Sequence, residues 1–75
     1  MIRFSKHALL KLEQRKIPRN FVFATLRKPD YTVESYGDRK IVFRKFKKLY
    51  LKVIFQRKSD KITIITQYWV NKIQI

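Results

Sequence analysis

Residues 49–55 read LYLKVIF, and this stretch decides the fold. Its odd-numbered positions are all apolar: Leu49, Leu51, Val53 and Phe55. The even-numbered positions that continue the pattern are mixed: Tyr50, Lys52, Ile54 and Gln56. Alternation with a period of two predicts a β-strand with one buried face. We therefore expect other elements to cover the odd face, and the even face to present aromatic and cationic side chains.

Turn-forming residues on both sides of this strand divide the C-terminal part of the chain into further strands. Lys47 and Lys48 precede the strand, residues 58–60 follow it, and Gly37 with Asp38 predicts an earlier hairpin turn. The sequence thus predicts an antiparallel sheet of about four strands: residues 31–36, 40–46, 49–56 and 61–70, with Ile2 and Phe4 as a short extra edge strand.

The last of these strands, residues 61–70, is apolar on both faces, which is typical of a central strand. In an unbroken strand Tyr68 shares the even face with Ile62 and Ile64. We expect Tyr68 on that face, held by a rigid element.

Two helices are predicted before the sheet, at residues 5–15 and 18–27. Ser5 is a suitable N-cap for the first helix, and Pro18 is suited to the first turn of the second. The fold class is α+β, with both helices packed on one face of the sheet. The expected core combines one stripe of each helix with the odd face of the LYLKVIF strand: Leu9, Leu12, Val22, Leu26, Leu51, Val53 and Phe55.

Composition limits the classes of function. The chain has 75 residues, enough for one domain spanning residues 1–75, and no cysteine, which excludes a disulfide-stapled toxin and a cysteine zinc finger. Lysine and arginine number 19 against five acidic residues, a net charge of +14. Such an excess predicts a polyanionic partner. The N-terminal residues carry charge throughout and no long apolar run exists, so we expect a cytoplasmic protein without a membrane partner.

Three stretches resemble a known family: FSKHALLKLEQRKIP at residues 4–18, RKPD at 27–30 and ITIITQYW at 62–69. They are similar to a small domain family related to the BrnT toxins, within the RelE/ParE toxin superfamily. The matching positions are His7, Ala8, Arg15, Ile17, Pro29, Tyr68 and Trp69; Lys11 stands where the family usually has arginine, and Lys16 where it has glycine. The resemblance implies a RelE/BrnT-like fold, a toxin-type ribonuclease that acts on mRNA, with the ribosome as one setting, and an acidic antitoxin as partner.

The residues themselves favour chemistry without a metal. Metal-dependent nucleases need clustered carboxylates, whereas the five acidic residues are scattered, and a single glycine leaves no phosphate-binding loop. We therefore expect no metal and no cofactor. In metal-free cleavage the ribose 2′-hydroxyl attacks its own phosphate, which calls for a base, an acid and cations around the phosphorane. The candidates are His7 and Tyr68 for the protons, and Lys52, Arg44 and Arg57 for the charge.

Structural interpretations of the same residues stay open. His7 is the one side chain that ordinarily titrates near neutral pH, but it also suits a helix start that hydrogen-bonds a strand. Tyr68 suits either a buried strand position or a proton donor. Arg15 is a helix-surface cation, a partner of Glu13, or a side chain that reaches the sheet.

Residues 39–58 hold nine of the 19 cations and no acid, with Phe46 and Tyr50 among them. A solvated charge run normally carries both signs, so this one predicts phosphate contact, with the aromatic rings available to stack on bases. The predicted nucleic-acid contacts are Lys11, Arg39, Lys40, Lys45, Lys47, Lys48, Tyr50 and Lys58. Two alternatives to the ribonuclease remain: a non-catalytic RNA- or DNA-binding module, and a ParE-type toxin that inhibits a protein.

Overall fold

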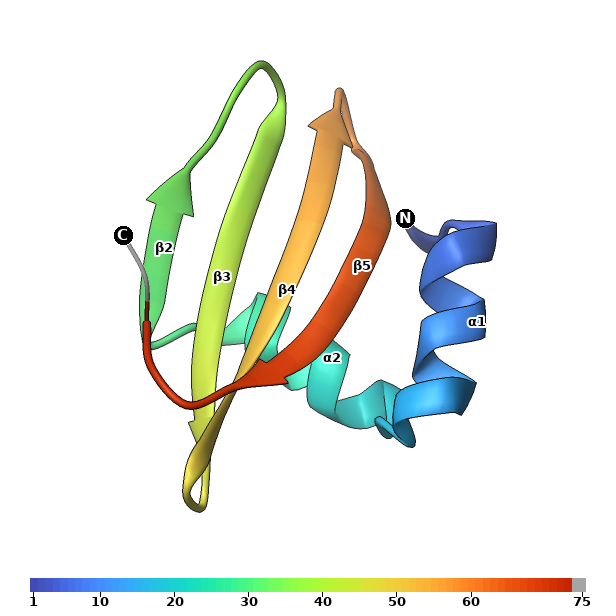
Figure 1. Cartoon of the computed structure of the whole chain (residues 1–75). Helices are drawn as coiled ribbons and strands as arrows, with labels where there is room; N and C mark the ends of the chain where they lie inside the picture. The colour runs from blue at the N-terminus through green and yellow to red at the C-terminus, as the bar shows by residue number, and fades with distance from the viewer. Residues whose placement is uncertain (74–75) are drawn as a thin grey trace.

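The LYLKVIF strand is the middle strand of a five-stranded sheet. This arrangement comes from a computed structural model, which describes residues 1–73 (Figure 1). The strand order is β1-β5-β4-β3-β2. The strands are β1 (Ile2–Phe4), β2 (Tyr31–Glu34), β3 (Arg39–Phe46), β4 (Leu49–Lys58) and β5 (Lys61–Val70), and the helices are α1 (Lys6–Arg15) and α2 (Arg19–Arg27).

The sheet contains the four antiparallel strands that the sequence predicted, together with the predicted short edge strand at Ile2–Phe4, whose parallel pairing makes the sheet mixed. Strands β2 to β5 pair antiparallel, and β1 adds a fifth strand parallel to β5. Ile2 pairs with Ile62 and Phe4 with Ile64, so the apolar alternation of this short strand matches that of β5. The middle of the sheet is therefore β4, and β5 is flanked by β1 only near its start.

The buried face is the one that the alternation in β4 predicted. Leu51 and Val53 are fully buried and Phe55 nearly so, in a cluster with Leu12 and Val22 of the helices. Leu26 is partly buried against this cluster. Leu9 was wrongly placed in the core, since 39% of it is exposed. The buried residues of α1 are Ala8 and Leu12, one helical turn apart, which directs Leu9 away from the sheet.

A register shift in β5 decides which of its side chains face the helices. Ile54 pairs with Thr66 and Phe55 with Ile64, so Ile65 is an extra residue without a partner. Before it, Ile64 belongs to the buried cluster; after it, Trp69 packs against that cluster and Tyr68 points to the opposite face. The expected sharing of one face by Tyr68, Ile62 and Ile64 is therefore wrong. An unpaired residue inverts the alternation, and nothing in the apolar pattern marks where it lies.

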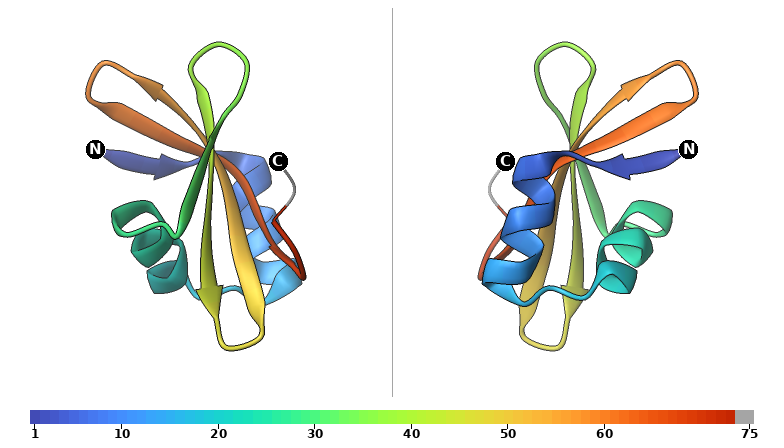
Figure 2. Two further views of the ribbon diagram at one scale, coloured as in Figure 1. Left: turned by 90° about the vertical axis from the view of Figure 1, so that its left-hand side faces the viewer. Right: turned by 90° about the vertical axis from the view of Figure 1, so that its right-hand side faces the viewer.

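The two helices occupy different positions relative to the sheet. Helix α2 crosses β3 and β4 on the buried face, whereas α1 lies alongside β5 at the edge of the sheet (Figures 1 and 2). The Ser5 side chain accepts a hydrogen bond from the Ala8 N–H at 3.0 Å, which confirms the predicted N-cap of α1. The backbone N–H of Ser5 also donates to the carbonyl of Ile64 at 2.9 Å. These bonds fix the start of α1 beside the start of the bulge.

Helix α1 ends in a Schellman motif, and Lys16 occupies its left-handed position with φ of 51°. The N–H of Ile17 donates to the Leu12 carbonyl at 3.0 Å and that of Lys16 to the Glu13 carbonyl at 3.3 Å. Ile17 and Leu12 are both buried, which supplies the apolar contact typical of this motif. Glycine adopts such a conformation without steric cost, so Lys16 stores strain at the corner between the helices.

We expect Lys16→Gly to raise the free energy of unfolding by roughly 0.5–1 kcal/mol, because it relieves this strain without removing a buried group. Urea unfolding monitored by circular dichroism measures the change. The matched control is Lys11→Gly in the interior of α1, which should lower stability by roughly the same amount. Equal destabilisation by both substitutions would contradict backbone strain at Lys16.

Candidate nucleic-acid interface

The face of the sheet opposite the core, which we call the open face, carries alternating aromatic and cationic side chains. Lys52 pairs with Phe43 on one side and with Tyr68 on the other, and Tyr50 pairs with Lys45 in the next row. The Lys45 ammonium lies 5.9 Å from the Tyr50 ring centre. As the alternation predicted, the side chains of Tyr50 and Lys52 point to the face opposite that of the buried Leu51 and Val53.

At the centre of this face, two cations flank the Tyr68 ring. The Lys52 ammonium lies 5.2 Å from the ring centre and the Arg15 guanidinium 5.3 Å from it. Because β5 lies between β4 and α1 (Figure 1), the two cations approach the ring from opposite sides of its strand. Both distances are typical of cation–π interactions, which position the two charges beside the phenol group.

Arg15 reaches this position because the outer edge of β5 is free beyond the bulge. Its Nη1 donates to the Gln67 carbonyl at 2.8 Å, at an edge that β1 does not cover. Of the three interpretations of Arg15, the structure thus supports a side chain that reaches the sheet. The sequence did not single out Arg15 as a site residue. Only its match to the family pattern pointed to it. Its hydrogen-bond partner is a backbone carbonyl, and every residue has one, so the sequence cannot show which one Arg15 contacts.

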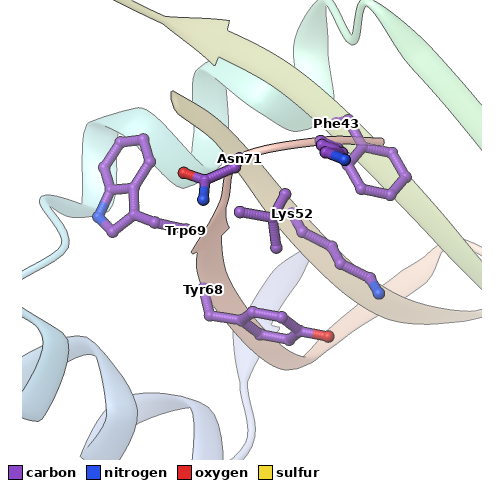
Figure 3. Close-up of a pocket in the computed structure, with 7 residues that line it drawn as sticks. Phe43, Lys52, Tyr68, Trp69 and Asn71 are labelled. Carbon is purple, nitrogen blue, oxygen red and sulfur yellow. The ribbon is translucent and has the colours of Figure 1, made fainter. Parts of the chain in front are cut away.

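A shallow open pocket of about 450 Å³ lies beside the flanked tyrosine (Figure 3). Its lining is Phe43, Lys52, Tyr68, Trp69, Val70, Asn71 and Lys72. Lys52 runs beside the Tyr68 ring, and the ammonium and hydroxyl groups point the same way. Phe43 is 1% exposed although it lies outside the core cluster, and its ring centre is 5.7 Å from the Lys52 ammonium. The lining thus combines apolar side chains with the ammonium groups of Lys52 and Lys72 and the phenol of Tyr68.

The charge of this region is largely unneutralised. Among residues 1–73 the one ion pair joins Lys40 and Glu34 at 3.8 Å, and both side chains are solvent-exposed. An exposed pair of this kind contributes little to stability. Within residues 1–73 neither Lys45 nor Lys52 has a carboxylate within ion-pair distance, so their field favours an anionic ligand.

Arg44 lies on the helix side of the sheet, away from Tyr68. It pairs with the buried Leu51, donates from Nη1 to the Ala24 carbonyl at 3.1 Å and lies 5.5 Å from the Phe46 ring centre. The Ala24 carbonyl also accepts from the Lys28 N–H at 2.9 Å, so Arg44 adds a second hydrogen bond that ties the end of α2 to β3, which is a structural role. The expected grouping of Arg44 with Lys52 and Tyr68 is not present.

Arg57 is also distant from the flanked tyrosine. It pairs with Ile62 near the β4–β5 turn and lies five positions beyond Lys52 along β4, roughly 16 Å away.

His7 is exposed in the first turn of α1, two residues after Ser5, whose N–H and hydroxyl donate to the carbonyls of Ile64 and Ile65. Arg15, which contacts Tyr68, lies just over two turns further along, roughly 12 Å. In the described part of the chain, the α1 side chain that contacts Tyr68 is that of Arg15, not that of His7.

The predicted phosphate-contacting residues divide by location. Lys45 and Tyr50 lie on the open face, and Arg39 pairs with Gln56 at its far end. Lys47 and Lys48 form the β3–β4 turn, Lys58 precedes the β4–β5 turn, and Lys40 is paired with Glu34. Lys11 lies on α1, where its ammonium donates to Gln14 at 3.0 Å.

The sequence matches the family described as Domain of unknown function (DUF4258) over residues 4–69. The chain belongs to this family. No curated protein and no solved structure gave a significant match. Within the described part of this DUF4258 domain, no helix is long and apolar enough to cross a membrane. Residues 1–73 also contain no group of three or more His, Cys, Asp or Glu side chains placed to hold a metal ion.

We expect Lys45→Ala/Lys52→Ala in this DUF4258 domain to flatten the salt dependence of its affinity for a labelled single-stranded oligouridine. Each lost phosphate contact should reduce the log–log slope by about 0.7, so the double variant should lose roughly 1.4. Fluorescence anisotropy between low and moderate salt measures the slope. Arg27→Ala/Lys28→Ala at the end of α2 removes the same charge and should leave it unchanged. Equal effects of the two double variants would show that net charge alone matters.

Proposed function

We propose that this domain binds single-stranded RNA on its open face and cleaves it without a metal at the flanked Tyr68. The observation that carries the proposal is the phenol of Tyr68 between the Lys52 ammonium and the Arg15 guanidinium. Two fixed cations beside a proton donor match the needs of a transition state in which phosphate gains negative charge.

The open face also favours a single strand over a duplex. Tyr31 is 52% exposed and pairs with Phe43. Tyr50 lies two residues before Lys52 on β4, so its side chain points to the same face. Exposed aromatic rings stack on unpaired bases, whereas the bases of a duplex are already stacked on each other. Lysines between the rings neutralise the phosphates that link such bases.

In the proposed reaction the ribose 2′-oxygen forms a bond to the adjacent phosphorus and releases its proton to water. The bond between phosphorus and the 5′-oxygen breaks, and the Tyr68 hydroxyl gives its proton to that oxygen. Lys52 and Arg15 stabilise the charge on the phosphorane, and Tyr68 then regains a proton from water. The products are a 2′,3′-cyclic phosphate and a 5′-hydroxyl end.

One observation favours a second candidate, an RNA-binding module without cleavage. The lining of the pocket in the described part of the chain includes neither a carboxylate nor an imidazole to take the proton of the 2′-hydroxyl.

The resemblance to the RelE/BrnT toxins supports the catalytic candidate. We therefore also propose a RelE/BrnT-like fold, an acidic antitoxin as partner and a cytoplasmic location.

We expect Tyr68→Phe to lower the cleavage rate of a single-stranded RNA by roughly 10²–10³-fold, because it removes the proton donor. Phenylalanine keeps the ring between the two cations, so RNA affinity and thermal stability should change little. The rate is measured with purified protein in the presence of EDTA, by electrophoresis of fragments and detection of their cyclic phosphate ends.

The matched control is Tyr50→Phe, which removes the same hydroxyl from the open face outside the pocket and should keep full activity. Equal loss in both variants would contradict a specific role for Tyr68. Binding without any cleavage by the wild-type protein would reject the catalytic proposal and leave the binding module.

A further inference from the structure

A second pocket, of about 550 Å³, lies on the helix side of the sheet, at the end where α2 begins and β3 turns into β4. Its lining is Phe21, Phe46, Lys47, Lys48, Leu49 and Trp69. We call it the aromatic pocket. Neither the predicted catalytic residues nor the flanked tyrosine contribute to its lining.

Three rings give the aromatic pocket a defined shape. Phe21 and Phe46 are stacked with centres 4.5 Å apart, and Trp69 stands perpendicular to both at 6.1 and 6.0 Å. All three are only half-buried. Aromatic side chains contribute most to stability when buried, so a solvent-accessible group of three in so small a chain indicates a surface that a ligand completes.

The rim of the aromatic pocket is cationic. Lys47 and Lys48 form the β3–β4 turn, and both are exposed. The only ion pair within residues 1–73 involves Lys40 and Glu34, so neither rim lysine has a carboxylate in ion-pair contact. An apolar floor under two unpaired cations is complementary to an apolar group with acidic neighbours.

We propose that the aromatic pocket binds an acidic peptide segment of a partner protein, with one bulky apolar side chain seated against the cluster of Phe21, Phe46 and Trp69. A nucleobase fits less well, because stacking needs a free ring face and Phe21 and Phe46 already stack on each other. A second copy of this chain would add another charge of +14 to the same surface. The complementary partner is therefore acidic.

This inference does not rest on RNA cleavage. The aromatic pocket opens on the helix side, where Phe46 and Leu49 pair with each other, whereas Lys52 and Tyr68 lie on the open face. A peptide bound in the pocket therefore leaves the flanked tyrosine accessible on the other face. Each surface can be altered while the other stays intact.

The test is a selection of a random short-peptide library against the full chain, followed by titration of an enriched peptide. Trp69, the only tryptophan, lines this pocket and also the pocket beside Tyr68, so its emission is read with the peptide alone, and the anisotropy of the labelled peptide gives its affinity. We expect enriched peptides to combine several Asp or Glu residues with a central Leu, Phe or Trp. Their binding should shift the Trp69 emission.

Lys47→Glu/Lys48→Glu should weaken binding of that peptide by about tenfold or more, because it reverses the charge of the rim. The matched control is Lys58→Glu/Lys61→Glu at the β4–β5 turn, which changes the net charge equally and should leave affinity nearly unchanged. Single-stranded oligouridine should bind the rim variant as tightly as it binds this control.

Three results would overturn the proposal: no enriched peptide, enriched peptides without acidic residues, or equal losses in the rim and control variants. Displacement of the peptide by oligouridine would assign the pocket to nucleic acid. Cleavage activity decides none of these outcomes, so a failure here is distinct from a failure of the proposed function.

Discussion

Burial of the odd face of β4 is the constraint on which the rest of the structure depends. Leu51 and Val53 are fully buried between the sheet and the helices, in a chain of 75 residues that can form only one small core. Because side chains alternate along a strand, burying these two residues directs Lys52 to the opposite face. The same alternation that stabilises the fold therefore places a half-buried cation at the centre of the face opposite the core.

The bulge at Ile65 completes the arrangement on β5. Without the extra residue, Tyr68 would keep the orientation of Ile64 and point into the core. With it, Tyr68 lies beside Lys52, and the uncovered edge of β5 accepts the hydrogen bond from Arg15. Bulges of this kind commonly redirect a side chain near a functional site. Here the local irregularity, rather than the regular pattern, assembles the candidate site.

The features that could be predicted from the sequence are those with local causes. The two helices, their start at Ser5, the turns at Gly37 and Lys47 and the buried face of β4 follow from periodicity, capping and turn chemistry, and the structure confirms them. The face of Tyr68 and the role of Arg44 could not be predicted. One depends on an unpaired residue, and the other on a carbonyl of α2 that becomes a neighbour only when the helix packs on the sheet.

For the same reason, the candidate site could be predicted only in part from the sequence. Lys52 and Tyr68 were both predicted from their residue types, but their pairing depends on register and on the bulge. Arg15 joined them through a backbone contact. The expected partner His7 was chosen for its chemistry, yet the helix that carries it places Arg15, rather than His7, at the tyrosine.

The central claim is that the open face is the RNA-binding surface, with Lys52 and Tyr68 at its centre. The most direct test is nuclear magnetic resonance of the isotope-labelled chain titrated with an oligonucleotide whose 2′-hydroxyls are methylated, so that it binds without being cleaved. The account predicts the largest shifts at Phe43, Lys52 and Tyr68 and at the guanidinium of Arg15, with α2 and the β3–β4 turn nearly unchanged. Shifts concentrated on α2 or on that turn, with Lys52 and Tyr68 unaffected, would contradict it.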